Sequence, residues 1–393
     1  MTLHKDIFHK AVVMTALAVM VLMCCQTEAC AQKLRIPQRW ETSFRNVLPL
    51  YRNDTVRICF IGDVMMHGKQ IEQARKEAGR YDFSSYFTLI KENLTSADIT
   101  AANMEFALGG EPYTGYPAFS APDGIASYAA DCGIDLFLTA NNHIFDKGKS
   151  GAERTMEIYR DLKRTYGISF TGLASDEVER SGNNPLIMNA KGIRLAFVNF
   201  TYGTNGGRRE GWPKVNYMDD RQDIAAALDI AKEKGADITI ALPHWGNEYE
   251  LTHSPGQEET AAWLAENGVD FIIGTHPHVV QDTMSIETSS GRTQVVYSLG
   301  NAVSNMSAEN TQLELMATAS IVRHFNGDIE VLPLELTFLW CSRPGGFNDS
   351  YTVVPVARYI GRRELWKGAW DYDKMMQTYS RVRQITGITD IHR

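Results

Sequence analysis

The amino-acid sequence predicts an α/β fold in which two β-sheets pack together and helices flank them. Two patterns support this prediction. In the first two thirds of the 393 residues, short apolar segments alternate with helical patterns, which is typical of βαβ units with parallel strands. Between residues 293 and 338, strand-like segments follow one another without helices, which indicates a more antiparallel second sheet.

The composition excludes some classes of function. With 44% hydrophobic and 22% charged residues, the chain has the composition of a soluble globular protein with a substantial core. The formal net charge is −8 and no Lys/Arg cluster is present, so nucleic acid is not expected as a partner. Outside the first 31 residues only Cys59, Cys132 and Cys341 remain, an odd number that cannot form a complete disulfide framework.

Apolar runs that end at polar residues indicate the strands of the first half, and amphipathic stretches between them indicate the helices. The expected strands are residues 56–62, 97–102, 135–140 and 168–171. The expected helices are residues 69–79, 123–132 and 151–166. The order of these elements predicts that each helix connects two parallel strands.

The second half begins with two strands in residues 185–200, divided by a turn at Lys191 and Gly192. Helical and apolar patterns alternate again after this pair. The expected helices are residues 223–234, 256–267 and 366–387. The expected strands are residues 237–242, 269–273, 293–298, 313–324 and 329–338.

The N-terminal segment has the pattern of a signal peptide. Lys5 and Lys10 precede an uncharged apolar run, residues 11–25, which is short for a membrane span. Small residues at 29–31 (Ala-Cys-Ala) then offer a cleavage site. We therefore expect export from the cytoplasm and a mature chain that begins at Gln32.

Two alternatives to cleavage stay open: lipid attachment at Cys24 or Cys25, and an uncleaved anchor helix. The rest of the chain is expected to form one domain with short flanking segments. Residues 32–55 are interpreted as a linker, residues 56–340 as the main domain, and residues 341–393 as a C-terminal extension that packs on it.

Polar residues follow several of the predicted strands, at the edge where ligands bind in α/β sheets. These residues are Asp63, Asn103, Glu105, Asn142, His143, His244, His276 and His278. Each one alone has an ordinary structural interpretation, such as capping a turn, but together they favour a site. Carboxylate, amide and imidazole groups suit divalent cations, and a pair of such cations can activate water for attack on phosphorus.

The segment around His276 and His278 is the strongest indication of such a site in the sequence. A buried apolar strand, residues 269–273, ends at Gly274, and His276 and His278 follow. Pro277 disfavours the helical conformation at the residue before it, so we expect extended geometry there. In an extended segment, residues two apart point the same way, so both imidazoles should face one spot.

Other catalytic motifs are missing from the sequence. It has no Gly-x-Ser-x-Gly nucleophile elbow, no Gly-x-x-x-x-Gly-Lys phosphate loop and no His-Glu-x-x-His zinc helix. Gly203, Gly206 and Gly207 lie in a loop that no helix follows, which argues against a dinucleotide site. Arg208 and Arg209 either bind an anionic substrate or form an ordinary exposed basic pair.

Taken together, the motifs resemble those of the bacterial capsule synthesis family, the CapA/PgsA-type proteins associated with poly-γ-glutamate. That family is similar to the calcineurin-like metallophosphoesterases, so the resemblance implies their α/β/β/α sandwich. The matching segments run in order along the chain and are residues 60–65, 102–105, 140–146, 244–249, 276–279 and 297–301.

The resemblance implies roles for individual residues. Asp63 matches the first-strand aspartate and Glu105 the bridging aspartate, while His143 matches the histidine that assists the leaving group. The implied metal ligands are Asp63, Glu105, Asn142, His244, His276 and His278, and the implied catalytic residues are His143, Asp63 and Glu105. The expected substrate contacts are Asn103, Glu248, Asn301, Arg208 and Arg209.

The implied cofactors are one or two divalent metal ions, with Mn, Zn, Fe and Mg not distinguished. The chain departs from the phosphoesterase pattern at one position. Met65 stands where those enzymes usually place a histidine, two residues after the first aspartate, and His67 lies two residues further on.

Two functions are therefore weighed. The first is an exported capsule or poly-γ-glutamate biosynthesis protein whose metal-dependent site hydrolyses a phosphoester or polymer bond. The second is a non-catalytic component that binds within an anionic exopolymer synthesis or export complex. Met65 favours the second. The first is favoured by four retained residues, Asn142, His143, His276 and His278.

Both functions imply the same kinds of partner and the same location. The expected partners are an anionic polymer or phosphoester substrate and membrane-embedded capsule synthesis proteins. The expected location is the periplasm, the cell envelope or the outer surface, with anchoring through the N-terminus as an alternative to release.

Overall fold

The computed structural model describes residues 53–289 and 291–389. The elements below belong to one compact unit, formed by residues 54–323 and 328–389. The predicted signal peptide and nearly all of the predicted linker lie outside the described residues. Within the described residues, no helix is both long enough and apolar enough to cross a bilayer.

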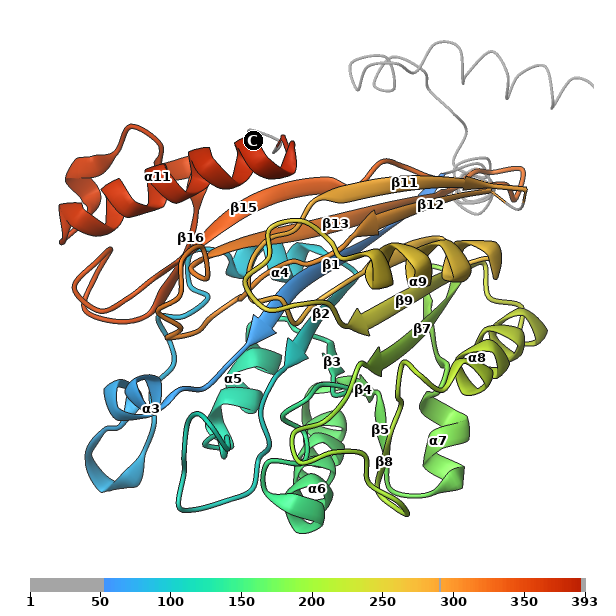
Figure 1. The fold of residues 1–393 in the computed structure, drawn as a ribbon, viewed down its shortest axis with the longest axis horizontal. Coiled ribbons are helices and arrows are strands. Elements are labelled where there is room, and N and C mark those ends of the chain that lie inside the picture. Colours follow the sequence, from blue (N-terminus) through green and yellow to red (C-terminus); the bar gives the residue numbers. More distant parts are fainter. Residues whose placement is uncertain (1–52, 290, 390–393) are drawn as a thin grey trace, which may run out of the picture. The chain divides into compact units, whose positions relative to one another are not determined.

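The first sheet is organised around its central strand, β1 (Asp54–Val64) (Figure 1). On one side the strands run parallel to it, in the order β2 (Ile99–Met104), β3 (Leu136–Leu138) and β4 (Ser169–Thr171). On the other side neighbouring strands are antiparallel, in the order β13 (Leu313–Arg323), β15 (Glu335–Ser342) and β16 (Thr352–Pro355), with β14 (Ile329–Val331) also paired to β13.

The second sheet has a parallel centre and antiparallel edges. Its parallel strands are β7 (Ile193–Thr201), β9 (Ile238–His244), β10 (Phe271–Ile273) and β12 (Gly291–Val296). Its antiparallel edge strands are β6 (Leu186–Ala190), beside β7, and β11 (Thr283–Thr288), beside β12. A separate short ribbon pairs β5 (Leu173–Ala174) with β8 (Lys214–Val215).

Helices cover both sheets (Figure 1). The α-helices are α3 (Gly68–Ala74), α4 (Lys91–Ser96), α5 (Gly124–Asp131), α6 (Gly148–Tyr166), α7 (Glu177–Asn183), α8 (Arg221–Glu233), α9 (Pro255–Glu266), α10 (Val356–Tyr359) and α11 (Ala369–Thr386). Local chemistry sets their ends. Ser254 and Gln257 form a capping box at the start of α9, and Gly167 ends α6 in the left-handed conformation, with φ of 78°.

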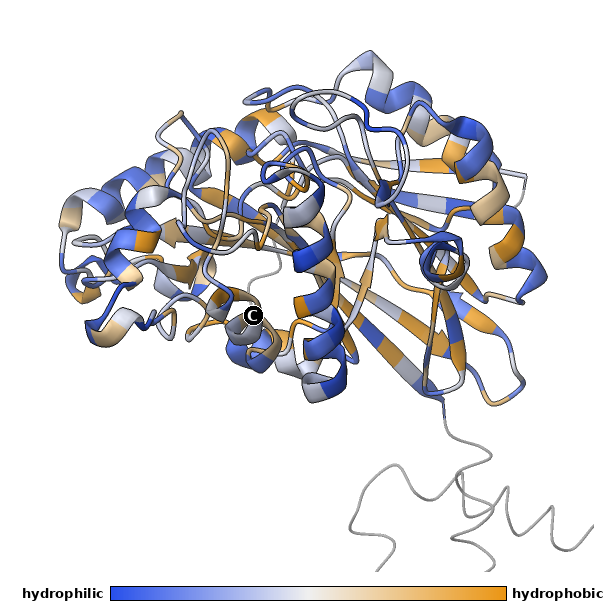
Figure 2. Ribbon diagram, turned by 90° about the horizontal axis from the view of Figure 1, so that it is seen from below, coloured by the Kyte–Doolittle hydropathy of each residue, from blue (hydrophilic) through white to orange (hydrophobic). Residues whose placement is uncertain are grey.

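The core explains the layered arrangement. Side chains along β1 alternate, so Ile58 and Phe60 pack against the second sheet, whereas Cys59 and Ile61 pack towards α5 and α6. A third apolar cluster joins the outer face of the second sheet to α8 and α9. Figure 2 shows apolar residues recurring along strands and helices with hydrophilic residues between them. The predicted sandwich of two sheets flanked by helices is confirmed.

Two details of the prediction are wrong. The late strands do not build a separate antiparallel sheet, because β13, β14 and β15 extend the first sheet from β1. Residues 313–321 are buried on both faces, so this strand takes a central position rather than an edge. The single strand expected at residues 329–338 is interrupted at Pro333, which has no N–H to donate to a ladder.

Some short elements were not expected, namely α4, α7, β11 and β16. Most of these sequences are too short or too polar to show a clear period. In β11 the sequence does alternate, with exposed residues between half-buried ones, because this strand lies at a sheet edge. The helix expected at residues 69–79 also ends early, at Ala74.

Candidate metal centre

The carboxyl ends of strands from both sheets meet and bring the predicted ligands together. The strands and the residues that they deliver are β1 with Asp63, β2 with Asn103 and Glu105, β3 with Asn142 and His143, β9 with His244, and β10 with His276 and His278. All these side chains are buried. Because strands of both sheets contribute, the candidate site lies at the carboxyl-end edge of both sheets.

Two donor clusters share Glu105. Asp63, Glu105 and His278 form one cluster, and Glu105, His244 and His276 form the other. The ligand atoms in each cluster lie within 4.8 Å of one another. Glu105 Oε1 lies 3.7 Å from His244 Nε2 and 3.7 Å from His278 Nε2. A single carboxylate oxygen therefore faces imidazoles of both clusters.

The donor set fits divalent cations. Asn142 Oδ1 lies 2.9 Å from His244 Nε2 and adds an amide oxygen to the second cluster. Glu105 Oε1 and His276 Nδ1 are buried without a hydrogen-bond partner among the described residues. Buried polar atoms are normally paired, and leaving one unpaired costs free energy. A divalent cation would give both atoms a partner, and oxygen and imidazole donors suit such a cation.

Burial is the main cause of the pKa shifts of three side chains at the candidate site. Burial, followed by the negative charge of Asp63, raises the pKa of Glu105 well above its usual value. Burial, followed by the neighbouring imidazoles, lowers the pKa of both His244 and His276 well below the usual value. Both rings are therefore neutral at pH 7, and a ring nitrogen of each has a lone pair available for a cation.

The segment after β10 differs from its prediction. His276 has φ of 98° and His278 has φ of 58°, so neither is in the extended conformation expected from Pro277. Their ring centroids are nevertheless 5.7 Å apart. The imidazoles converge because two left-handed residues turn the chain, not because alternate side chains of a strand share a face. Such conformations cost free energy in non-glycine residues and concentrate at functional sites.

The end of β1 is held by close backbone contacts. A Cβ atom on Gly62 would lie 2.0 Å from the carbonyl oxygen of Gly300, so only glycine fits there. The backbone N–H of Asp63 donates to that same carbonyl at 3.0 Å. Glu314, which the sequence pattern did not single out, accepts from the N–H of Gly62 at 2.8 Å, and burial raises its pKa to about 8.

The structure places Asn103 and Asn301 behind the candidate metal ligands. Asn103 Nδ2 donates to Asp63 Oδ1 at 2.7 Å, and Asn141 Nδ2 in turn donates to Asn103 Oδ1 at 3.1 Å. His278 Nδ1 donates to Asn301 Oδ1 at 2.9 Å. Both asparagines are buried, and hydrogen bonds of this kind orient metal ligands.

His143 has partners that the sequence pattern did not reveal. Its Nδ1 donates to Asp146 Oδ2 at 2.6 Å, and Asn205 Nδ2 donates to Asp146 Oδ1 at 3.3 Å. The ring packs edge-on against Phe119, with centroids 4.6 Å apart. Asp146 could have been found from its position three residues after His143, whereas Asn205 lies in a glycine-rich loop that gives no such signal.

Met65 and His67 are not part of either donor cluster. Met65 is buried in the apolar core between the first sheet and its helices. His67 is half-buried and belongs to the capping box of α3, together with Gln70. The cluster around Asp63 therefore has no histidine from this stretch.

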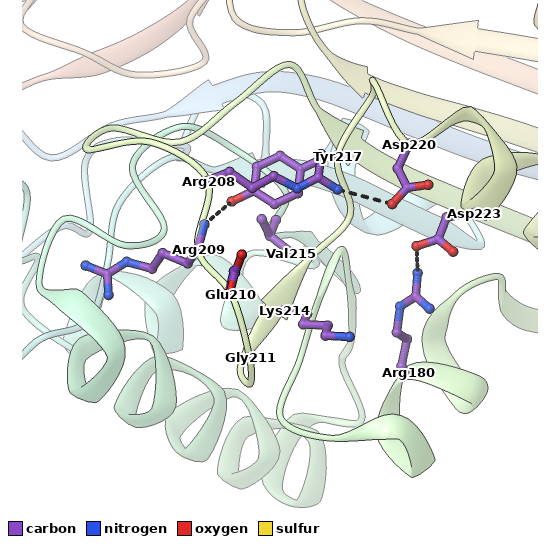
Figure 3. A pocket seen from close by; sticks show the side chains of 10 residues that line it. All are labelled: Arg180, Arg208, Arg209, Glu210, Gly211, Lys214, Val215, Tyr217, Asp220 and Asp223. Carbon is purple, nitrogen blue, oxygen red and sulfur yellow. Dashed lines mark hydrogen bonds and ion pairs between the residues drawn. The ribbon is translucent and has the colours of Figure 1, made fainter.

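Arg208 and Arg209 lie in the loop between β7 and β8. Arg208 pairs with Asp219 at 2.8 Å and with Asp220 at 3.1 Å. Arg209 lies over the ring of Phe145, 5.3 Å from its centroid. Figure 3 shows the pocket that this loop helps to line, with a volume of about 250 Å³, and the Arg209 side chain extends away from the ion-paired residues.

Comparison with known sequences identifies the family. The bacterial capsule synthesis protein family PGA_cap matches residues 57–306, which include every predicted metal ligand. The capsule biosynthesis protein CapA of Bacillus anthracis is 25% identical over 295 residues, covering 72% of this chain and 68% of that protein. The PGA biosynthesis protein CapA of Bacillus subtilis is 25% identical over 297 residues, covering 73% of each chain.

Solved structures also align with this chain, at low sequence identity. The 5′-nucleotidase precursor from Thermus thermophilus aligns with a TM-score of 0.45 and 12% identity, covering 84% of this chain and 59% of that one. The calcineurin-like phosphoesterase YfkN from Bacillus subtilis aligns with a TM-score of 0.42 and 13% identity, covering 86% and 100%. Because the family match spans more than half of its length, this chain belongs to the bacterial capsule synthesis protein family PGA_cap.

Proposed function

We propose that this chain is an exported protein of capsule or poly-γ-glutamate-type polymer production that carries a metal-dependent phosphoesterase-like site. The observation that carries this proposal is Glu105 Oε1, a buried oxygen without a partner among the described residues that lies between two donor clusters. A carboxylate in that position suits two divalent cations close together. Membership of the capsule synthesis family supports the biological role.

The cations would be held by the residues that converge on Glu105. Those residues are Asp63, Glu105 and His278 for one cation, and Glu105, Asn142, His244 and His276 for the other. When bound, the cations supply positive charge for the phosphoryl oxygens and lower the pKa of a water. The protein contributes neutral imidazoles, fixed carboxylates and a site whose ligands are buried.

We assign to His143 the role of donating a proton to the leaving oxygen. The Asp146 carboxylate and the edge of Phe119 fix its ring. In this orientation His143 Nε2 faces the metal centre and lies 3.9 Å from Glu105 Oε1. A proton on that nitrogen can pass to a leaving oxygen, because the other nitrogen keeps its bond to the Asp146 carboxylate.

The loop between β7 and β8 is proposed to contact an anionic substrate beyond the reacting group. Asn205 N donates to the carbonyl of Asn142 at 2.8 Å, so this loop touches the metal centre. Arg209 lies further along the loop and Lys214 lies in β8; both are exposed, and neither is paired with a carboxylate among the described residues. Two exposed cations on this loop and the strand after it favour a substrate with more than one negative charge.

The alternative is a protein that binds an anionic polymer without cleaving it, as part of a complex with membrane-embedded synthesis proteins. Met65 favours it, because the cluster around Asp63 contains three donors where the other has four. A single cation could bind a substrate without supplying the charge that hydrolysis requires. Turnover measurements separate the two functions.

The experiment uses the full chain, stripped of metal and then supplied with Mn²⁺ or Zn²⁺. Phosphomonoesters, phosphodiesters and poly-γ-glutamate are offered as substrates. We expect cation-dependent turnover of at least one phosphoester, abolished by a chelator and restored by the cation. Binding of poly-γ-glutamate without turnover of any substrate would support the non-catalytic function instead.

A substitution tests the anionic contacts. We expect an Arg209→Gln/Lys214→Gln double variant to bind poly-γ-glutamate about 10-fold more weakly at low salt, since two charge-assisted contacts are lost. Affinity measured by calorimetry at two salt concentrations is the readout. A Lys149→Gln/Arg164→Gln variant removes the same charge from exposed positions on α6 and should bind as the wild type does. Equal affinity in both variants would remove these residues from the proposal.

Export is proposed from the leader pattern, which lies outside the described residues. Mass spectrometry of the protein recovered from cells is the check. An N-terminus at Gln32 is expected. An intact Met1 with its apolar run, or a lipid on Cys24 or Cys25, would instead indicate an anchored protein.

A further inference from the structure

Glu248 forms a third donor cluster at the metal centre. Its carboxylate, with His276 and His278, provides ligand atoms that lie within 4.8 Å of one another. Glu248 is exposed, whereas the members of the other two clusters are buried. The carboxylate therefore approaches the same two imidazoles from the side that is open to solvent.

The backbone holds Glu248 against the histidine segment. Trp245 N donates to the carbonyl of Thr275 at 3.0 Å, and Tyr249 N donates to the carbonyl of Pro277 at 2.9 Å. Tyr249 has φ of 69°, a left-handed conformation that costs free energy in a residue other than glycine. Backbone hydrogen bonds therefore hold this exposed segment against residues 275–277 on both sides of Glu248.

The cluster around Asp63 lacks a donor that the other cluster has. It contains three donors, whereas the second contains four once Asn142 is included. Met65 is buried in the apolar core and His67 caps α3, so this stretch supplies no further ligand. Among the described residues, Glu248 is the remaining carboxylate that shares a donor cluster with the two histidines.

The negative charge of Glu248 also favours a bound cation next to it. A free carboxylate at the entrance of a site for anionic substrates would repel them, whereas a carboxylate bound to a cation would not. We propose that Glu248 is a metal ligand that completes the cation position at Asp63 and His278, rather than a substrate contact. This inference deepens the proposed function and rests on it, because it concerns the same centre.

The test measures cation binding directly. Metal-free wild type and a Glu248→Gln variant are titrated with Mn²⁺, and free Mn²⁺ is followed by electron paramagnetic resonance. We expect the wild type to bind two cations. We expect the variant to bind one cation with wild-type affinity. It should bind the second cation at least about 10-fold more weakly, because substitutions around a metal site usually reduce metal affinity by this factor or more. Because Glu248 is exposed, the substitution should leave the fold intact.

Glu250→Gln is the matched control. Glu250 is exposed in the same segment and accepts from Asn247 Nδ2 at 3.0 Å, outside the donor clusters, so its loss should not change either affinity. Wild-type binding of both cations by Glu248→Gln, or binding of only one cation by the wild type, overturns the assignment. Phosphoester turnover is measured separately: loss of the second cation without any wild-type turnover supports Glu248 while rejecting the hydrolytic function.

Discussion

A His143→Ala variant is expected to keep its bound metal and to lose roughly 10²–10⁴-fold of its turnover on phosphoesters with poor leaving groups, the usual contribution of a general acid. The reason lies in the geometry. His143 is turned towards the centre by Asp146, but it belongs to neither donor cluster that shares Glu105. Its loss should therefore remove a proton and leave the cations in place.

A comparison of substrates with good and poor leaving groups provides an internal control for the His143→Ala variant. Esters of good leaving groups need little protonation, so His143→Ala should slow them much less. Asn142→Ala is the companion variant, because Asn142 lies beside His143 in the chain but contributes its amide oxygen to the cluster of His244. It should lose metal and activity together. If His143→Ala releases metal as readily as Asn142→Ala, the separation of ligand from proton donor is wrong.

The second large effect is expected on metal binding and stability. Asp63→Ala and His244→Ala should each lower the bound divalent metal and reduce the rise in Tm that Mn²⁺ produces. A ligand that binds only the folded state stabilises it by about 2.7 kcal/mol at a concentration 100 times its Kd. Each variant removes a buried donor from one of the two clusters that share Glu105, so much of this stabilisation should disappear.

His253→Ala is the control for these variants. His253 is a partly buried histidine whose Nδ1 donates to Asp282 Oδ2 at 2.9 Å, but it lies outside the donor clusters. Its substitution can lower the Tm of the metal-free protein, yet the shift on adding Mn²⁺ should equal that of the wild type. Equal Mn²⁺-dependent shifts in Asp63→Ala, His244→Ala and wild type would show that this edge of the sheets is not a metal site.

The sequence was sufficient to expect the candidate residues at one edge of the sheets, because the signal in the sequence is local. A buried strand is an apolar run, and the polar residue that follows it must lie at the sheet edge. Asp63, Glu105 and His244 each follow such a run, so their convergence could be expected before any contact was known. The layered α/β arrangement follows from the same alternation of strand and helix patterns.

Other features depend on contacts between distant parts of the chain. Whether β13 pairs with β1 or begins a new sheet depends on which neighbour buries both of its faces, and an apolar run does not specify that neighbour. The left-handed φ values of His276 and His278 oppose the local preference set by Pro277. They are held by surrounding contacts, such as the bond from His278 Nδ1 to Asn301.

If Glu105 lies between two divalent cations, anomalous diffraction from crystals grown with Mn²⁺ should reveal both. We expect two anomalous peaks, one among Asp63, Glu105 and His278 and one among Glu105, His244 and His276. A Glu105→Gln crystal should lose at least one of these peaks. Peaks only on surface carboxylates, or an ordered site in which Glu105 Oε1 is bonded to no cation, would contradict this placement of Glu105.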